Sequence, residues 1–140
     1  MADGFSIDVD RAAVVAALLS LADAAQPYIN VAAHESADSI VREAKTRLDR
    51  KLSGTSTGAT VAGIHDQPAY DGNGYAVISS RDPMPNLPLW LEKGTKKGRG
   101  THAQPALSYF YSAAQLEEGP HLRRIDEALQ HAIAEKGLGE

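Results

Sequence analysis

The chain has 140 residues, of which 43% are hydrophobic and only 6% aromatic, with a formal net charge of −4 and a pI of about 5.7. This length favours one domain with a thin, alanine-rich core, which neighbouring subunits often complete. The net negative charge argues against a protein that coats nucleic acid without sequence specificity. Cysteine is absent, which excludes disulfides, thiolate metal sites and a cysteine nucleophile.

The beginning of the sequence lacks the basic-then-apolar order of a signal peptide. We also expect no apolar run to approach the length that spans a bilayer. These two observations predict that the protein has no membrane partner, and the absence of cysteine fits assembly in a reducing cytoplasm.

Residues 1–8 are expected to form a flexible lead-in, and residues 9–52 are expected to form two helices. Pro27 suits the first turn of a helix, so it should separate a helix ending near Ala25 from one ending near Leu52. One face of the second helix is cationic and should be solvated, with contact to an acidic partner as the alternative. The cations on this face are Arg42, Lys45, Arg47, Arg50 and Lys51.

Residues 59–93 are expected to hold a small antiparallel sheet built on a β-hairpin. The predicted strands are 59–65 and 75–80. Asp-Gly and Asn-Gly, dipeptides that favour tight hairpin turns, lie between them at 71–74. Residues 82–88 contain three prolines and should be neither helix nor central strand. The last residues of the segment, 89–93, should be a short strand or a single helical turn.

Residues 94–102 are expected to be a glycine-rich basic loop, and residues 105–136 are expected to be helical. Pro105 should open a third helix, and the Gly-Pro pair at 119–120 should separate it from a fourth. The order helix, helix, hairpin, helix, helix is typical of the α+β class. The chain should therefore be one domain of N-terminal helices, a small antiparallel sheet and C-terminal helices.

An apolar anchor stands next to the cationic loop. Trp90 and Leu91 are expected to be buried, with Glu92 held in place beside them. The four cations that follow have no acid among them, which favours a loop that docks on acidic protein or nucleic-acid phosphate; a solvated loop is the alternative. The predicted interaction residues are Trp90, Glu92, Lys93, Gly94, Thr95, Lys96, Lys97, Arg99 and Pro105.

No group of residues indicates a catalytic or cofactor site, so we expect neither an enzyme nor a cofactor. His34 and Asp38 could share a metal on one helix face, but the sequence names no third ligand, and we expect no metal. The alternative function is a small cytoplasmic enzyme or a nucleic-acid-binding regulator. It would use Glu92 and the basic loop at 93–99.

Four segments occur in a distinctive order over residues 30–136. They are an alanine-rich helix followed by a Thr-Gly pair at 57–58, a Leu-Glu-Lys-Gly-Thr motif at 91–95, the basic loop, and Ala-Gln-Pro-Ala-Leu at 103–107. Together they resemble the tail-completion and head–tail joining proteins of long-tailed bacteriophages, which are minor virion proteins of the neck. The chain departs from that pattern at Ala106, where an aromatic residue is usual, and at Tyr109, where a proline is usual.

The resemblance implies a non-enzymatic structural protein that forms a ring, often a hexamer, between the portal end of the head and the tail tube. Its partners would be copies of itself, neck or connector proteins, and tail-tube or tail-terminator proteins, with transient contact to DNA in the channel. The implied location is the virion, after assembly in the host cytoplasm.

Overall fold

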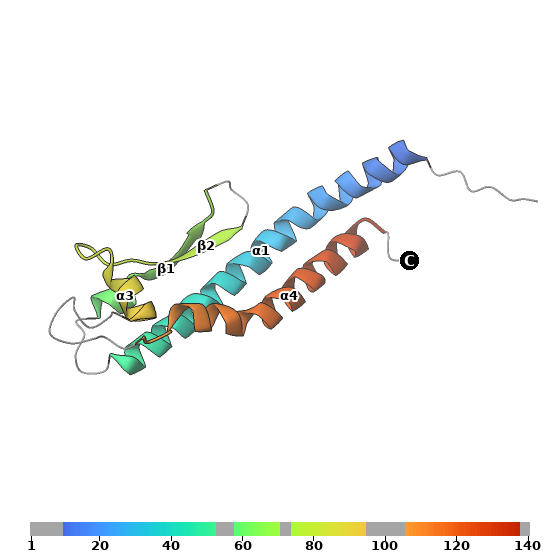
Figure 1. The fold of residues 1–140 in the computed structure, drawn as a ribbon. Helices are drawn as coiled ribbons and strands as arrows, with labels where there is room; N and C mark the ends of the chain where they lie inside the picture. Colours follow the sequence, from blue (N-terminus) through green and yellow to red (C-terminus); the bar gives the residue numbers. More distant parts are fainter. Residues whose placement is uncertain (1–9, 53–57, 71–73, 95–105, 138–140) are drawn as a thin grey trace, which may run out of the picture.

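The structure is a computed structural model in which two long helices run side by side and carry a β-hairpin (Figure 1). It describes residues 10–52, 58–70, 74–94 and 106–137. Within these ranges the elements are α1 (Arg11–Lys51), α2 (Ala59–Ala62), β1 (Ile64–Pro68), β2 (Tyr75–Ser79), α3 (Leu87–Lys93) and α4 (Phe110–Glu135). The predicted α+β class, with helices at both ends and a small antiparallel sheet, is confirmed.

Helix α1 is continuous over 41 residues, a length of about 60 Å. The side chain of Asp10 caps its start by accepting the backbone N–H of Ala13 at 3.1 Å. The prediction of two helices that meet at Pro27 is therefore wrong. Proline removes one backbone hydrogen bond from a helix interior, but Ala25 and Ala32 on either side of it are both buried. Packing on both sides holds the two halves in line.

Helix α4 is also continuous, so the predicted break at 119–120 is wrong. Glu117 and Arg124 lie on either side of that pair and form an ion pair with each other. Arg124 Nη1 also donates to Ser36 Oγ of α1 at 3.2 Å, and Ser36 Oγ lies 2.7 Å from His121 Nδ1. This polar network joins the two halves of α4 to α1 across the proline.

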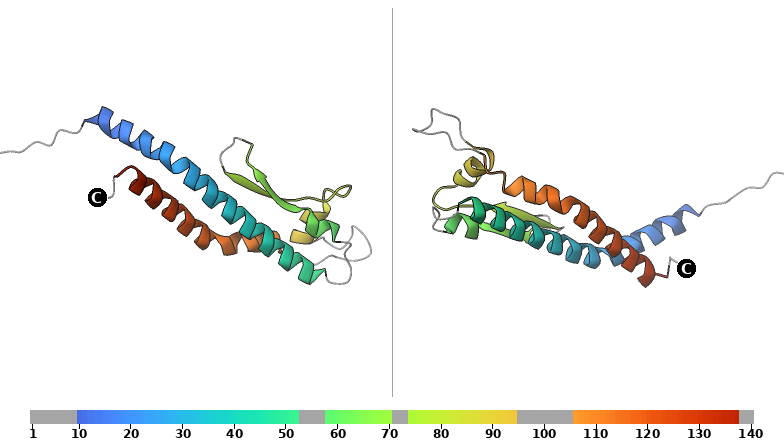
Figure 2. Two further views of the ribbon diagram at one scale, coloured as in Figure 1. Left: turned by 180° about the vertical axis from the view of Figure 1, so that it is seen from behind. Right: turned by 90° about the horizontal axis from the view of Figure 1, so that it is seen from below.

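Helices α1 and α4 are antiparallel and contact each other through small side chains (Figures 1 and 2). The buried alanines are Ala25, Ala32, Ala37 and Ala44 on α1 and Ala113, Ala128 and Ala132 on α4. Alanine lets two helix backbones approach closely, but each residue buries little apolar area. The thin core expected from composition is found along this contact.

The larger core residues gather where the C-terminal part of α1 meets the hairpin, α3 and the start of α4. Leu48, Ile64 and Tyr109 are the largest fully buried side chains, and Leu91 of α3 packs in the same cluster. Four elements that are distant in sequence therefore meet around one core. This core fixes the positions of the residues on either side of the predicted basic loop.

The predicted hairpin is confirmed, with β1 and β2 antiparallel and Ile64 opposite Ser79. The strand predicted at 59–65 is wrong in its first half, where the chain forms the helical turn α2. Gly58 precedes that turn with a left-handed φ of 82°, and β1 starts only after Gly63, whose carbonyl accepts the backbone N–H of Ser80 at 3.0 Å. The sheet is thus confined to residues 64–79, inside the predicted 59–93.

Helix α3 begins inside the stretch 82–88 from which the prolines were expected to exclude helix. Pro88 lies in the first turn of α3, where a missing N–H costs nothing because no carbonyl within the helix awaits it. Of the two alternatives for 89–93, the helical turn is correct.

The N-terminal part of α1 is more apolar than the sequence analysis allowed. An 18-residue window there has a mean hydropathy of 1.5 and is only 6% buried, so this helix is long and apolar enough to cross a membrane. The expectation that no apolar run reaches that length is therefore wrong. Core helices of soluble proteins and signal sequences meet the same test, so the window assigns no membrane role.

Candidate interaction site

Two backbone hydrogen bonds tie the end of α3 to the residues before α4. The N–H of Leu107 donates to the carbonyl of Leu91 at 2.8 Å, and the N–H of Ser108 donates to the carbonyl of Glu92 at 3.2 Å. These bonds bring together the two ends of segment 95–105, which itself lies outside the described residues. The place where this segment leaves the fold is thus fixed by backbone contacts.

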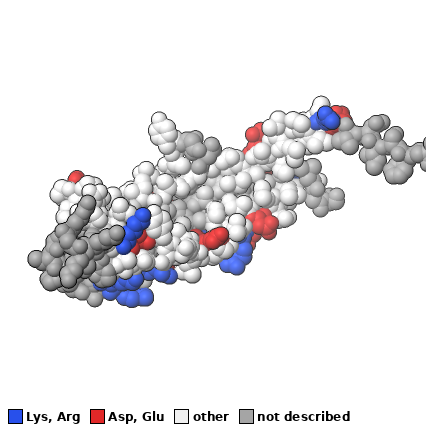
Figure 3. Space-filling view, viewed as in Figure 1, with Lys and Arg blue, Asp and Glu red and all other residues white. Residues whose placement is uncertain are grey.

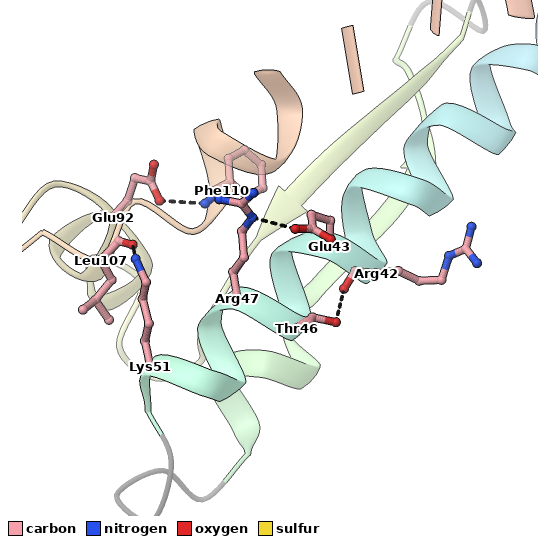
Figure 4. Close-up of polar contacts among 8 residues, drawn as sticks. All are labelled: Arg42, Glu43, Thr46, Arg47, Lys51, Glu92, Leu107 and Phe110. Carbon is pink, nitrogen blue, oxygen red and sulfur yellow. Dashed lines mark hydrogen bonds and ion pairs between the residues drawn. The ribbon is translucent and has the colours of Figure 1, made fainter. Parts of the chain in front are cut away.

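The side chain of Glu92 caps α4 from outside that helix. It is 7% exposed, and one oxygen accepts the N–H of Phe110 at 2.8 Å (Figure 4). The other oxygen accepts the N–H of Tyr111 at 3.1 Å. A helix N-terminus leaves its first N–H groups unpaired and carries a partial positive charge, so a carboxylate is well suited there. The expectation that Glu92 is held in place is confirmed. Its carboxylate in turn caps the N-terminus of α4.

Tyr109 completes this junction and was missed as a site residue by sequence reasoning. Its side chain is fully buried, and its hydroxyl lies 2.7 Å from Ser79 Oγ and donates to the carbonyl of Pro88 at 3.3 Å. Burial raises the pKa of this hydroxyl. The third helix was expected to open at Pro105, but residues 106–109 are not helical and α4 begins only at Phe110. No sequence signal therefore singled out Tyr109 as the residue before the helix.

Trp90 does not have the buried position that was predicted for it. Its side chain is 40% exposed, whereas Leu91 is 7% exposed, as expected. Helix α3 buries Pro88, Leu91 and Glu92, and Trp90 projects to a different side because successive helical residues are turned by about 100°. Leu91 is therefore the apolar anchor of the junction.

The predicted interaction residues lie partly beyond the described chain. Lys93 is exposed at the end of α3, and Gly94 ends that helix with a φ of 78°. The interaction residues outside the described ranges are Thr95, Lys96, Lys97, Arg99 and Pro105.

The C-terminal part of α1 forms a basic end of the molecule next to this junction (Figure 3). Lys51 donates to the carbonyl of Leu107, and Arg47 pairs with Glu43 at 2.8 Å (Figure 4). The remaining cations of this face form no ion pair with any described residue. They are Arg42, Lys45 and Arg50, and these three with Lys51 are called the basic end below.

The opposite end of α1 is an exposed apolar surface. Val14, Val15, Leu18 and Leu19 are 45–62% exposed and are called the apolar end below. Helix α4 ends beside the N-terminal half of α1, where His131 stacks on Tyr28, and no described element covers the apolar end beyond it (Figures 1 and 2). Contiguous exposed apolar side chains of this kind mark interaction surfaces.

Comparison of the chain with models of known protein families, with curated proteins and with solved structures finds no match. What the protein does is therefore inferred from its own residues, namely the apolar end, the basic end and the junction at Glu92.

Proposed function

We propose that this protein is a structural virion component of the bacteriophage neck, which completes the tail and joins it to the head as part of a ring of identical copies. The order of motifs over residues 30–136 supports this function. The observation that carries the proposal is the apolar end, because a ring needs a surface on which copies associate.

Self-association through the apolar end has a clear physical source. The four side chains Val14, Val15, Leu18 and Leu19 are largely exposed in the single chain. Burying one such side chain contributes roughly 1.5–3 kcal/mol, which is partly offset by the loss of freedom on association. The alanine-rich contact between α1 and α4 adds little stability of its own, so a neighbouring copy would also complete a thin core.

The basic end supports the second part of the function, contact with acidic surfaces of the head or tail. Arg42, Lys45 and Arg50 are without ion pairs to described residues. By sequence, three further cations follow in segment 95–105, whose two ends are fixed beside this surface. Opposite charges steer and orient docking partners. The partners would be neck or connector proteins and tail-tube or tail-terminator proteins, with DNA in the channel as a transient contact.

The alternative, an enzyme or nucleic-acid-binding regulator that uses Glu92, is less well supported. Both oxygens of the Glu92 carboxylate accept backbone N–H groups of α4, and the side chain is buried. A general base needs an oxygen that can reach the proton of a substrate. The contacts of Glu92 favour a structural role.

The test uses the full-length protein alone and mixed with purified tails or tail-tube rings, with mass measured by light scattering. A double change in the apolar end, Leu18→Ser with Leu19→Ser, should abolish the assembled species while the circular dichroism spectrum keeps its helical signal. Leu116→Ser, at an equally exposed site on α4, is the matched control and should assemble normally.

Two results would overturn the proposal. One is a monomer mass under every assembly condition. The other is binding of the wild-type chain, but not of the apolar-end variant, to phospholipid vesicles without any assembly on tails. The second result would make the exposed helix a membrane-binding segment.

A further inference from the structure

Three potential metal ligands from two elements meet on one side of α1. His34 Nε2 lies 3.6 Å from Asp38 Oδ1, one helical turn away, and 3.4 Å from Asp66 Oδ2 of β1. The ligand atoms of all three residues lie within 4.8 Å of one another. Among the described residues this is the one such group. The sequence offered no third ligand for His34 and Asp38, and the hairpin supplies it.

The oxygen of Asp66 that faces this group lacks a donor. Although its side chain is 22% exposed, Oδ2 itself is shielded from solvent and accepts no hydrogen bond from the described residues. The contact with His34 Nε2 is an ion-pair distance without hydrogen-bond geometry. Buried polar atoms are almost always satisfied, and leaving one unpaired is costly. A bound cation would satisfy this oxygen.

The imidazole ring of His34 is held in a position that suits a ligand. It stacks on the ring of Tyr75 in β2, with 4.5 Å between ring centroids and an interplanar angle of 13°. Zinc binds nitrogen and oxygen at about 2.0–2.2 Å, which places neighbouring ligands of a tetrahedral site about 3.3–3.6 Å apart. The two distances from His34 fall in this range, so only the two carboxylates have to turn toward each other.

We propose that His34, Asp38 and Asp66 bind a divalent transition-metal ion, zinc foremost, with water completing the coordination. A nitrogen ligand favours such an ion over calcium or magnesium, which prefer oxygen alone. The ion joins the β-hairpin to α1 beside the groove that Ala37, Tyr75, Val77 and His121 help to line. This site does not depend on the proposed neck function.

The experiment titrates untagged, full-length protein with zinc by calorimetry and with cobalt, whose visible absorption reports tetrahedral coordination. One ion per chain should bind, and zinc should raise the melting temperature. Asp66→Asn should weaken binding by about tenfold or more. Asp49→Asn, an exposed aspartate elsewhere on α1, is the control and should bind as the wild type does.

Absence of saturable binding at millimolar zinc overturns the proposal and leaves a histidine between two carboxylates. Equal zinc affinity of the wild type and Asp66→Asn would place the ion at other histidines and would also overturn the proposal. If Asp66→Asn does not keep the circular dichroism spectrum of the wild type, Asp38→Asn serves instead, because Asp38 is exposed on α1. Unchanged affinity in that variant also rejects the site.

Discussion

The carboxylate of Glu92 accepts the backbone N–H of Phe110 at 2.8 Å, although 18 residues separate the two in the sequence. With the second bond, from the N–H of Tyr111 at 3.1 Å, one side chain supplies the cap that α4 lacks locally, since Tyr109 at its start makes no side-chain cap bond. The stability of α4 therefore depends on the position of α3.

Glu92→Gln should lower the free energy of unfolding by roughly 1–3 kcal/mol, because the amide nitrogen cannot accept a hydrogen bond and the favourable charge at the helix N-terminus is lost. Denaturant unfolding followed by circular dichroism measures this change. Glu118→Gln, an exposed change on α4, is the control. Equal stability of the two variants would mean that the Glu92 cap contributes nothing.

Gly63→Ala should destabilise the hairpin, because a Cβ at this position would lie 1.8 Å from the backbone oxygen of Ser80. Forcing the two segments apart should cost about 1–3 kcal/mol or more. Gly119→Ala is the contrasting variant. Apart from its chain neighbours it has nothing within 4 Å of its Cβ, but Pro120 disfavours helical backbone for a preceding residue that has a Cβ, so the gain expected of Gly→Ala in a helix should be largely cancelled. Thermal melts should show a clear loss for Gly63→Ala and only a small change for Gly119→Ala, and an equal or larger loss for Gly119→Ala would contradict this account.

Trp90→Ala should cost about 1–2 kcal/mol, less than the 3–5 kcal/mol typical of a buried aromatic residue, because the ring is 40% exposed. Leu48→Ala removes a fully buried side chain and should cost about 2–5 kcal/mol. Chemical denaturation of the two variants compares these losses. A larger loss for Trp90 than for Leu48 would show that the tryptophan, after all, anchors the junction.

The stability of the protein should fall above a pH of about 10, the pKa of an unfolded tyrosine. Burial raises the pKa of Tyr109, and the nearby Glu92 carboxylate raises it further, while the hydrogen bond with Ser79 acts in the opposite direction. Because the folded pKa exceeds the unfolded one, this contribution is complete below the unfolded pKa and is lost as pH rises through the folded pKa.

Tyr109→Phe should flatten this alkaline decline in unfolding free energy, measured by denaturant titration at several pH values. Tyr70→Phe removes an exposed tyrosine and should leave the slope unchanged. The Glu135 carboxylate raises the pKa of Tyr28, and that group remains in both variants. An identical slope in the wild type and Tyr109→Phe would assign the decline to another group.

Lys96→Glu combined with Lys97→Glu tests the proposed neck function. This double change should leave the melting temperature nearly unchanged, because the sequence places no acid within 93–105 to pair with these lysines, and ion pairs of this kind contribute little to stability. The same variant should join heads to tails less well in vitro, and most clearly at low salt, where charges are screened least. Lys136→Glu, at an exposed position near the end of α4, is the control for net charge. Normal joining by the double variant would show that Lys96 and Lys97 do not contribute to joining.

Local sequence signals were sufficient to predict the structure where the interacting residues are close together in the sequence. The hairpin was predictable because Asp-Gly and Asn-Gly, which favour tight turns, lie in the sequence between the two strands that pair. The helix breaks at Pro27 and at 119–120 were not real, because contacts between α1 and α4 outweigh the local cost of proline. Such contacts join residues far apart and leave no local pattern.

For the candidate site residues too, local properties could be predicted from the sequence, whereas contacts with distant segments could not. Glu92 was predictable as a placed residue from its neighbours, but its partner Phe110 depends on how α3 and α4 meet. The burial of Trp90 depended on whether its segment was strand or helix, a choice that a short apolar run does not settle. Asp66 could not be assigned to His34, because the register of the hairpin on α1 brings them together.

The hydrogen bond from Leu107 to Leu91 has a consequence for how this protein can vary. It closes the chain at the base of segment 95–105, so a change in the length of that segment does not alter the spacing of α3 and α4. Each doubling of a closed loop costs only about 0.6 kcal/mol. An epitope inserted after Arg99 should therefore be accepted by the same fold, with a melting temperature close to that of the wild type.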